Sequence, residues 1–238
     1  MRNLLFKIAF VGSAFHGWQQ QENAVTVQGE LKKAWESLTG EIPNIIGCSR
    51  TDAGVHANEY FFNVRTESTI PAESFPVALA SAKLPKEISI YSCEEVDYEF
   101  NARFDCVKKE YEYVIENTKI PSPFLYKRAF NHKYKIDVDL MNEAAQHFVG
   151  THDFSAFCAN KNMKKSTVRY IHAVQIERVG NEIRFLVTGN GFLHHMVRIM
   201  VGTLLEIGRK ERPSDSIPNL FGASRSQAGQ LMDSCGLC

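Results

Sequence analysis

Apolar and polar residues alternate along the first hundred positions in two different periods, one typical of strands and one of helices. Residues 4–11 form an apolar run, and residues 59–65 alternate between apolar and polar, as a half-buried strand does. Between them, apolar residues recur at helical spacing after Thr26, a candidate N-cap, and stop at Gly40. The predicted elements are a strand at 4–11, a helix at 27–38, strands at 42–46 and 59–65, a helix at 71–83 and a strand at 88–96. This order is that of a ferredoxin-like α+β unit.

The second half of the chain repeats the alternation of strands and helices without a detectable sequence repeat. The predicted elements are a strand at 110–115, a helix at 138–149, a hairpin at 168–177 and 182–188, and helices at 192–207 and 213–221. No linker rich in Gly, Ser or Pro separates the halves. We therefore predict an α+β fold. Two ferredoxin-like halves, residues 1–102 and 103–238, would share one central, mostly antiparallel sheet flanked by helices.

Charge is balanced overall but unevenly distributed. The 238 residues carry 27 basic and 27 acidic side chains, which by itself argues weakly against a nucleic-acid partner. Residues 161–212, however, hold ten basic and four acidic residues, a net charge of +6. Residues 86–116 hold four basic and nine acidic residues, a net charge of −5. A polarised molecule can present a basic face despite a neutral sum.

Other classes of protein find little support. No apolar run approaches the roughly 20 residues of a membrane span, and the N-terminus is not typical of a signal peptide, so we expect a cytoplasmic protein. The six cysteines are then expected to be reduced. Cys235 and Cys238 have the spacing of half a zinc site, but no second pair accompanies them, and coincidence is the favoured interpretation.

The strongest candidate for chemistry is the loop from Gly47 to Ala57. It holds one cation, Arg50, and one carboxylate, Asp52, between two predicted strands. A tight turn would explain its Gly, Ser, Thr and Asp content equally well. However, the string Ser-Arg-Thr-Asp-Ala-Gly-Val-His-Ala closely resembles the active-site loop of the TruA family of tRNA pseudouridine synthases, with Ser49 in place of the usual first Gly.

Two further motifs carry the same resemblance. Residues 190–198, Asn-Gly-Phe-Leu-His-His-Met-Val-Arg, are similar to the family's motif Asn-x-Phe-x-His-His-Met-Val-Arg. Residues 108–113 are similar to the family's basic-x-Tyr-x-Tyr element. The resemblance implies an isomerase that converts uridine to pseudouridine at positions 38, 39 and 40 of the tRNA anticodon stem-loop. It implies a homodimer and no metal or organic cofactor.

The resemblance also implies the roles of individual residues. Asp52 would be the nucleophile, Arg198 would orient it, and Tyr111 would stack on the flipped base. Arg50 would assist base flipping, although a plain phosphate contact would explain it equally well, and Leu237 would pack on the uracil ring. Phosphate contacts are expected from the basic residues Lys161, Lys164, Lys165, Arg169 and Arg209.

Two alternatives remain open on the sequence. One is a catalytically inactive RNA-binding relative, suggested because family members usually continue after the Gly236-Leu237 pair with a further strand. The other is a carboxylate-dependent nucleosidase or glycosidase. That class normally uses a pair of acidic residues, and the loop offers one carboxylate beside Arg50.

Overall fold

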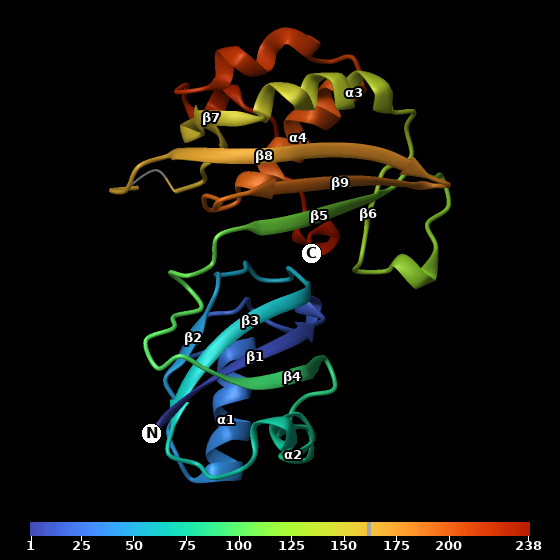
Figure 1. Ribbon diagram of the computed structural model, residues 1–238. Coiled ribbons are helices and arrows are strands. Elements are labelled where there is room, and N and C mark those ends of the chain that lie inside the picture. The colour runs from blue at the N-terminus through green and yellow to red at the C-terminus, as the bar shows by residue number, and fades with distance from the viewer. Residues whose placement is uncertain (161–162) are drawn as a thin grey trace. The chain divides into compact units, whose positions relative to one another are not determined.

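The chain divides into two compact units, Met1–Val107 and Lys108–Cys238. The computed structural model in Figure 1 describes residues 1–160 and 163–238. None of the helices in these residues is both long and apolar enough to span a bilayer.

The first unit is the ferredoxin-like arrangement that the sequence predicts. Its elements are β1 (Arg2–Phe10), α1 (Val27–Thr39), β2 (Ile45–Gly47), β3 (Ala57–Thr66), α2 (Phe75–Ser81) and β4 (Ile88–Val96). The strands pair antiparallel in the order β2-β3-β1-β4. Figure 1 shows α1 and α2 together on one face of this sheet. Phe6 of β1 lies against both helices, with its ring centroid 5.8 Å from those of Trp35 and Phe75.

The predicted ends of α1 are confirmed. The Thr26 side chain accepts a hydrogen bond from the backbone N–H of Gly29 at 3.2 Å, which satisfies one of the first amides of the helix. Gly40 ends the helix in the left-handed conformation, with φ of 75°. The second helix is shorter than predicted, because the turn Ala72–Ser74 before α2 is a 3-10 helix.

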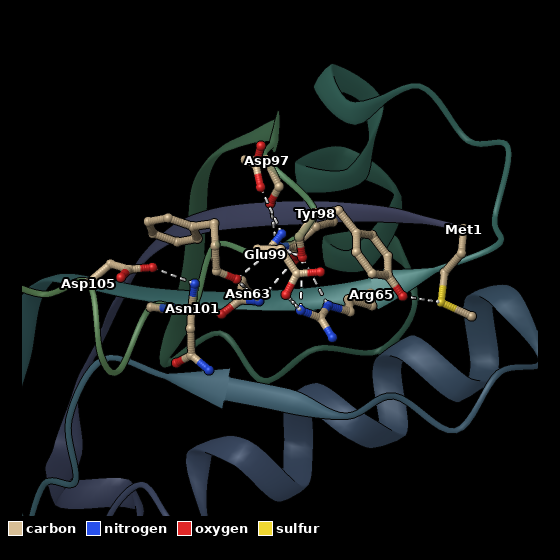
Figure 2. A network of polar contacts seen from close by, with 11 residues as sticks. Met1, Asn63, Arg65, Asp97, Tyr98, Glu99, Asn101 and Asp105 are labelled. Carbon is tan, nitrogen blue, oxygen red and sulfur yellow. Dashed lines mark hydrogen bonds and ion pairs between the residues drawn. The ribbon is translucent and has the colours of Figure 1, made fainter.

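A buried polar network fastens the segment that follows β4 to the sheet (Figure 2). Asn63 of β3 donates to the side-chain oxygen of Asn3 and accepts from the backbone N–H of Ala102, each at 2.9 Å. Asn3 in turn donates to the carbonyls of Asp97 and Phe100, both at 2.9 Å. Both asparagines are fully buried and satisfied, so they hold residues 97–102 against the sheet.

The second unit is built on a five-stranded sheet. Its elements are β5 (Lys109–Glu116), β6 (Phe130–Asn131), α3 (Val138–Ala145), β7 (Gly150–Asp153), β8 (Val168–Val179), β9 (Glu182–Gly189) and α4 (Met196–Gly208). The strand order is β6-β5-β9-β8-β7, antiparallel except for the β5–β6 pair. In Figure 1, α3 and α4 lie on the same side of this sheet. Eleven of the thirteen residues of α4 are buried, so this helix forms the centre of the core.

The α+β class is confirmed, but the single shared sheet is not. In the described residues the strands form one four-stranded and one five-stranded sheet. Periodicity predicts that a segment is a strand but not which strand it pairs with. The helix expected at 192–207 begins at Met196, because His195 is left-handed with φ of 64°. The last predicted helix is a 3-10 helix, Ser214–Leu220, with Pro218 inside it.

Candidate active site

The loop that carries Asp52 connects β2 to β3 and is held by the segment that follows β1. The backbone N–H of Trp18 donates to the carbonyl of Thr51 at 3.2 Å, and that of Gly54 to the carbonyl of Phe15 at 3.2 Å. Val55 N–H donates to the Asp52 carbonyl at 3.2 Å and closes a turn around the carboxylate. Asp52 is therefore placed by backbone hydrogen bonds on both sides of it.

Two glycines allow this close packing. Gly17 has φ of +88°, and a Cβ there would lie only 2.6 Å from the Thr51 carbonyl oxygen. A Cβ on Gly47 would lie 2.7 Å from the ring of Trp18, which is 2% exposed. The Tyr60 hydroxyl, from β3, donates to the Ser49 carbonyl of the loop. Asp52 is half-buried and Arg50 is exposed.

In the second unit, β5 and the segment before α4 bring two aromatic rings together. Tyr111 is half-buried, and its ring meets that of Phe192 edge to face, with centroids 5.0 Å apart. Phe192 packs over Gly189 of β9, where an added Cβ would lie 3.2 Å from the phenyl ring. Lys109 pairs with Gly189 and Tyr111 with Val187, so Tyr111 and Gly189 lie on the same face of the sheet. Phe192 thereby limits the orientation of Tyr111.

Arg198, in the first turn of α4, is tied to the C-terminal segment. Its Nε donates to the Met232 carbonyl at 2.7 Å. The hydroxyl of Tyr113, a fully buried side chain of β5, donates to the carbonyl of Asp233 at 2.8 Å. Leu237 forms a β-bridge with Tyr113 and is 5% exposed. The second unit therefore gathers Arg198, Leu237 and the strand that carries Tyr111.

Charge and burial around this segment fix two protonation states. Burial raises the pKa of the Tyr113 hydroxyl well above its usual range, so it remains a hydrogen-bond donor. The backbone N–H of Cys235, 2.8 Å from the Asp233 carboxylate, lowers the pKa of that group, and Arg198 lowers it further. Asp233 is therefore ionised close to Arg198, a second anion that sequence reasoning did not identify.

The predicted phosphate contacts do not share one environment. Lys164 and Lys165 are exposed in the loop before β8, and Lys161 lies outside the described residues. Arg169 is half-buried, and its guanidinium donates to the carbonyls of Ser166 and Val168 at 2.9 and 2.7 Å. Burial lowers the pKa of Arg169. Arg209, just after α4, is exposed and paired with Glu211.

Comparisons with known proteins identify the class to which this arrangement belongs. A family model described as tRNA pseudouridine synthase matches residues 7–105 and 144–238. The chain is 42% identical to tRNA pseudouridine synthase A of Acetivibrio thermocellus, over all of this chain and 97% of that protein. It is 40% identical to the protein of the same name from Brevibacillus brevis, again over 100% and 97% of the two chains.

The chain is thus a tRNA pseudouridine synthase, an isomerase. Within that class it belongs to the TruA family, as its Asp52 loop and its motif before Arg198 predict. The matches favour neither the inactive RNA-binding relative nor the nucleosidase.

Sequence reasoning missed the residues that support the site. Phe192 stands in the same motif as Arg198, so its position was visible, but its contact with Tyr111 depends on the pairing of β5 with β9. The Met232 carbonyl has no sequence signal, because any residue supplies one.

Proposed function

We propose that this chain isomerises uridine to pseudouridine at positions 38, 39 and 40 of the anticodon stem-loop of tRNA. The observation that carries the proposal is the Asp52 loop, a carboxylate placed by backbone bonds in a chain that resembles TruA proteins throughout its length. The tRNA substrate follows from the family. The three positions follow from the resemblance of the motifs.

The proposed reaction balances without an external oxidant or reductant. The N1–C1′ bond of the uridine breaks, a C5–C1′ bond forms, and the hydrogen on C5 is released as a proton while N1 gains one. Asp52 acts as the nucleophile, at either the sugar C1′ or the base C6, and leaves again when the new bond is complete. The base must leave its stack to reach the carboxylate, which costs a few kcal/mol.

The second unit supplies the remaining roles. Tyr111, held edge-on by Phe192, stacks on the flipped uracil, and its hydroxyl helps to move the C5 proton. Leu237 packs on the ring. Arg198 orients Asp52, because a guanidinium near a carboxylate favours its ionised form. The hydrogen bond from Arg198 Nε to the Met232 carbonyl restrains the guanidinium for this role.

The outer contacts complete the proposal. Arg50 enters the RNA as the uridine leaves it, and phosphates are bound by the basic residues Lys161, Lys164, Lys165, Arg169 and Arg209. The protein acts as a homodimer in the cytoplasm, where tRNA is modified.

Mapping of pseudouridine tests the positions. Three tRNA transcripts are prepared, each with uridine at only one of positions 38, 39 and 40 and cytidine at the other two. We expect a carbodiimide-dependent primer-extension stop immediately 3′ of that one position in each transcript after treatment with the enzyme. Stops that report pseudouridine elsewhere in the tRNA, with none at these three positions, would contradict the assignment while leaving the isomerase activity in place.

A further inference from the structure

The connection from β5 to α3 is unusually rich in exposed cations and rings. Residues 119–135 contain five basic and no acidic side chains. We call this segment the basic–aromatic surface; its exposed cations are Lys119, Lys127, Arg128, Lys133 and Lys135. Between them stand three exposed rings, with Phe124 89%, Tyr126 73% and Tyr134 58% exposed. None of the residues expected to contact RNA from the sequence lies in it.

Buried and half-buried polar groups fasten the basic–aromatic surface near both of its ends. The Asn117 side chain donates to the carbonyls of His132 and Tyr134, at 2.8 and 2.7 Å. Glu116, 5% exposed, accepts from the backbone N–H of Ser122 at 2.7 Å. The rings are therefore presented by an ordered backbone, and less conformational entropy is lost when a ligand binds.

The rings and cations occur side by side rather than in separate patches. Lys127 Nζ lies 5.4 Å from the ring centroid of Tyr126, and Lys133 Nζ lies 5.2 Å from that of Tyr134. In the part of the chain that the structure describes, no ion pair involves Arg128 or Lys133. A surface that joins stacking faces with positive charge matches a strand with bases and phosphates better than it matches an apolar protein face.

The basic–aromatic surface adjoins the site already described in the same unit. The Cys235 thiol donates to the Ala129 carbonyl, with Sγ and O 3.5 Å apart. Cys235 lies two residues before Leu237, the residue proposed to pack on the uracil. The segment that carries Leu237 is therefore in direct contact with the basic–aromatic surface.

We propose that the basic–aromatic surface is a second RNA-binding site, which takes an unpaired segment of the tRNA substrate. Unpaired bases stack on Phe124, Tyr126 and Tyr134, and the neighbouring cations bind the phosphates between them. The inference rests on the proposed function for the identity of the RNA. It extends that function from the reacting uridine to a part of the tRNA outside the reaction centre.

Two variants and two matched controls test the inference in the full chain. Phe124→Ala/Tyr126→Ala removes two stacking faces, and Arg128→Ala/Lys133→Ala removes two cations. Tyr91→Ala, 60% exposed in the first unit, controls for loss of an exposed ring. Lys33→Ala/Lys86→Ala controls for loss of two exposed cations of that unit. The affinity for tRNA is measured by filter binding from 50 to 200 mM salt, with kcat and KM from tritium release and the oligomeric state from sedimentation.

We expect the aromatic variant to bind tRNA at least tenfold more weakly, with KM raised and kcat nearly unchanged. The charge variant should lower the slope of log K against log salt concentration by about one for each lost phosphate contact. Both controls should match the wild type. Unchanged affinity and slope in both variants would overturn the inference. So would a shift of the aromatic variant to a smaller oligomer with unchanged RNA affinity per chain, because the rings would then contact a second copy.

The outcome separates this inference from the proposed function. If the wild type releases no tritium but binds tRNA, and the variants weaken that binding, the proposed function fails and the RNA-binding surface stands. If the wild type is active and the variants bind tRNA as the wild type does, the second RNA-binding site is refuted and the proposed function stands. Circular dichroism checks that each variant is folded, and the charge variant changes only exposed residues.

Discussion

Substitution of Gly229 by Ala tests how the C-terminal segment positions Arg198. Gly229 crosses α4 at close range, where its N–H donates to the Thr203 hydroxyl at 2.9 Å. Thr203 is fully buried, and an added Cβ would press most closely on its backbone nitrogen and would lie 2.6 Å from its Cα and 2.7 Å from the carbonyl carbon of Gly202. Ordinary contact for a Cβ begins at 3.4 Å, so the two backbones must separate by more than 0.8 Å (3.4 minus 2.6), because the Thr203 nitrogen lies nearer than the Cα.

The magnitude follows from two opposing terms. Gly229 lies outside the left-handed region, so an Ala there would normally stabilise by about 0.4–1 kcal/mol through the unfolded chain. Overpacking against fixed backbone costs about 1–3 kcal/mol and outweighs this gain. We expect a net loss of about 1–2 kcal/mol in the free energy of unfolding, or a Tm lower by about 2–4 °C for each kcal/mol.

The substitution Gly229→Ala should also lower kcat, even at temperatures where the variant remains folded. Met232, which accepts from Arg198 Nε, lies three residues beyond Gly229, so the displacement reaches the anchor of the guanidinium. A misplacement of about 1 Å at a catalytic group can cost on the order of 10²-fold in rate. Tritium release well below the Tm of the variant should therefore show kcat lowered by about ten- to a hundredfold, with tRNA affinity little changed.

A matched control isolates the clash. Gly191→Ala places a Cβ no closer than 3.8 Å to any neighbour, the Nε of Arg169, so its Tm should stay near that of the wild type. A Gly229→Ala protein with unchanged or raised Tm would refute the packing argument. A destabilised variant with wild-type kcat would instead refute the link between this segment and Arg198.

Three further predictions concern single groups of the second unit. Tyr113→Phe removes the donor to the Asp233 carbonyl and should lower the free energy of unfolding in urea by about 0.5–1.5 kcal/mol; an unchanged midpoint would contradict this contact. Burial raises the pKa of the Cys235 thiol to about 12. At pH 8 its alkylation by iodoacetamide, followed by mass spectrometry, should therefore be at least about a hundredfold slower in the folded than in the unfolded protein, and equal rates would refute the burial. Burial and the charge of Arg209 lower the pKa of His132 in the folded state, so the unfolded chain binds a proton first and the free energy of unfolding decreases as pH falls through about 6.5. His132→Asn should therefore lose less stability than the wild type between pH 8 and 5.5, and equal losses would contradict the assignment.

The sequence predicted those parts of the fold that local signals determine. The first unit follows from apolar periodicity, and the limits of α1 follow from Thr26 and Gly40, whose side-chain acceptor and left-handed backbone act within one turn. β6 and β7 were missed, since they have two and four residues and are too short to show a period. The partner of each strand was also beyond prediction, because pairing depends on residues far apart in the chain.

In the candidate site, too, local signals were visible in the sequence and contacts between distant residues were not. The Asp52 loop was visible because its chemistry and its glycines stand in one continuous stretch. The groups that anchor Arg198 and Tyr111 were not visible in the sequence. Arg198 is anchored by the backbone carbonyl of Met232, and Tyr111 by the ring of Phe192, which the pairing of β5 with β9 brings near. The left-handed His195 was missed too, since φ above zero is uncommon for a residue other than glycine.

The role of Asp52 as nucleophile is tested by tritium release from tRNA that carries 5-tritiated uridine, for wild type and Asp52→Asn side by side. The substitution keeps the size of the side chain and removes its charge and nucleophilicity. We expect release by the wild type and none by the variant, with tRNA affinity retained in both. Release by both proteins would refute Asp52 as the nucleophile. Binding without release by the wild type would contradict the proposed isomerase activity itself.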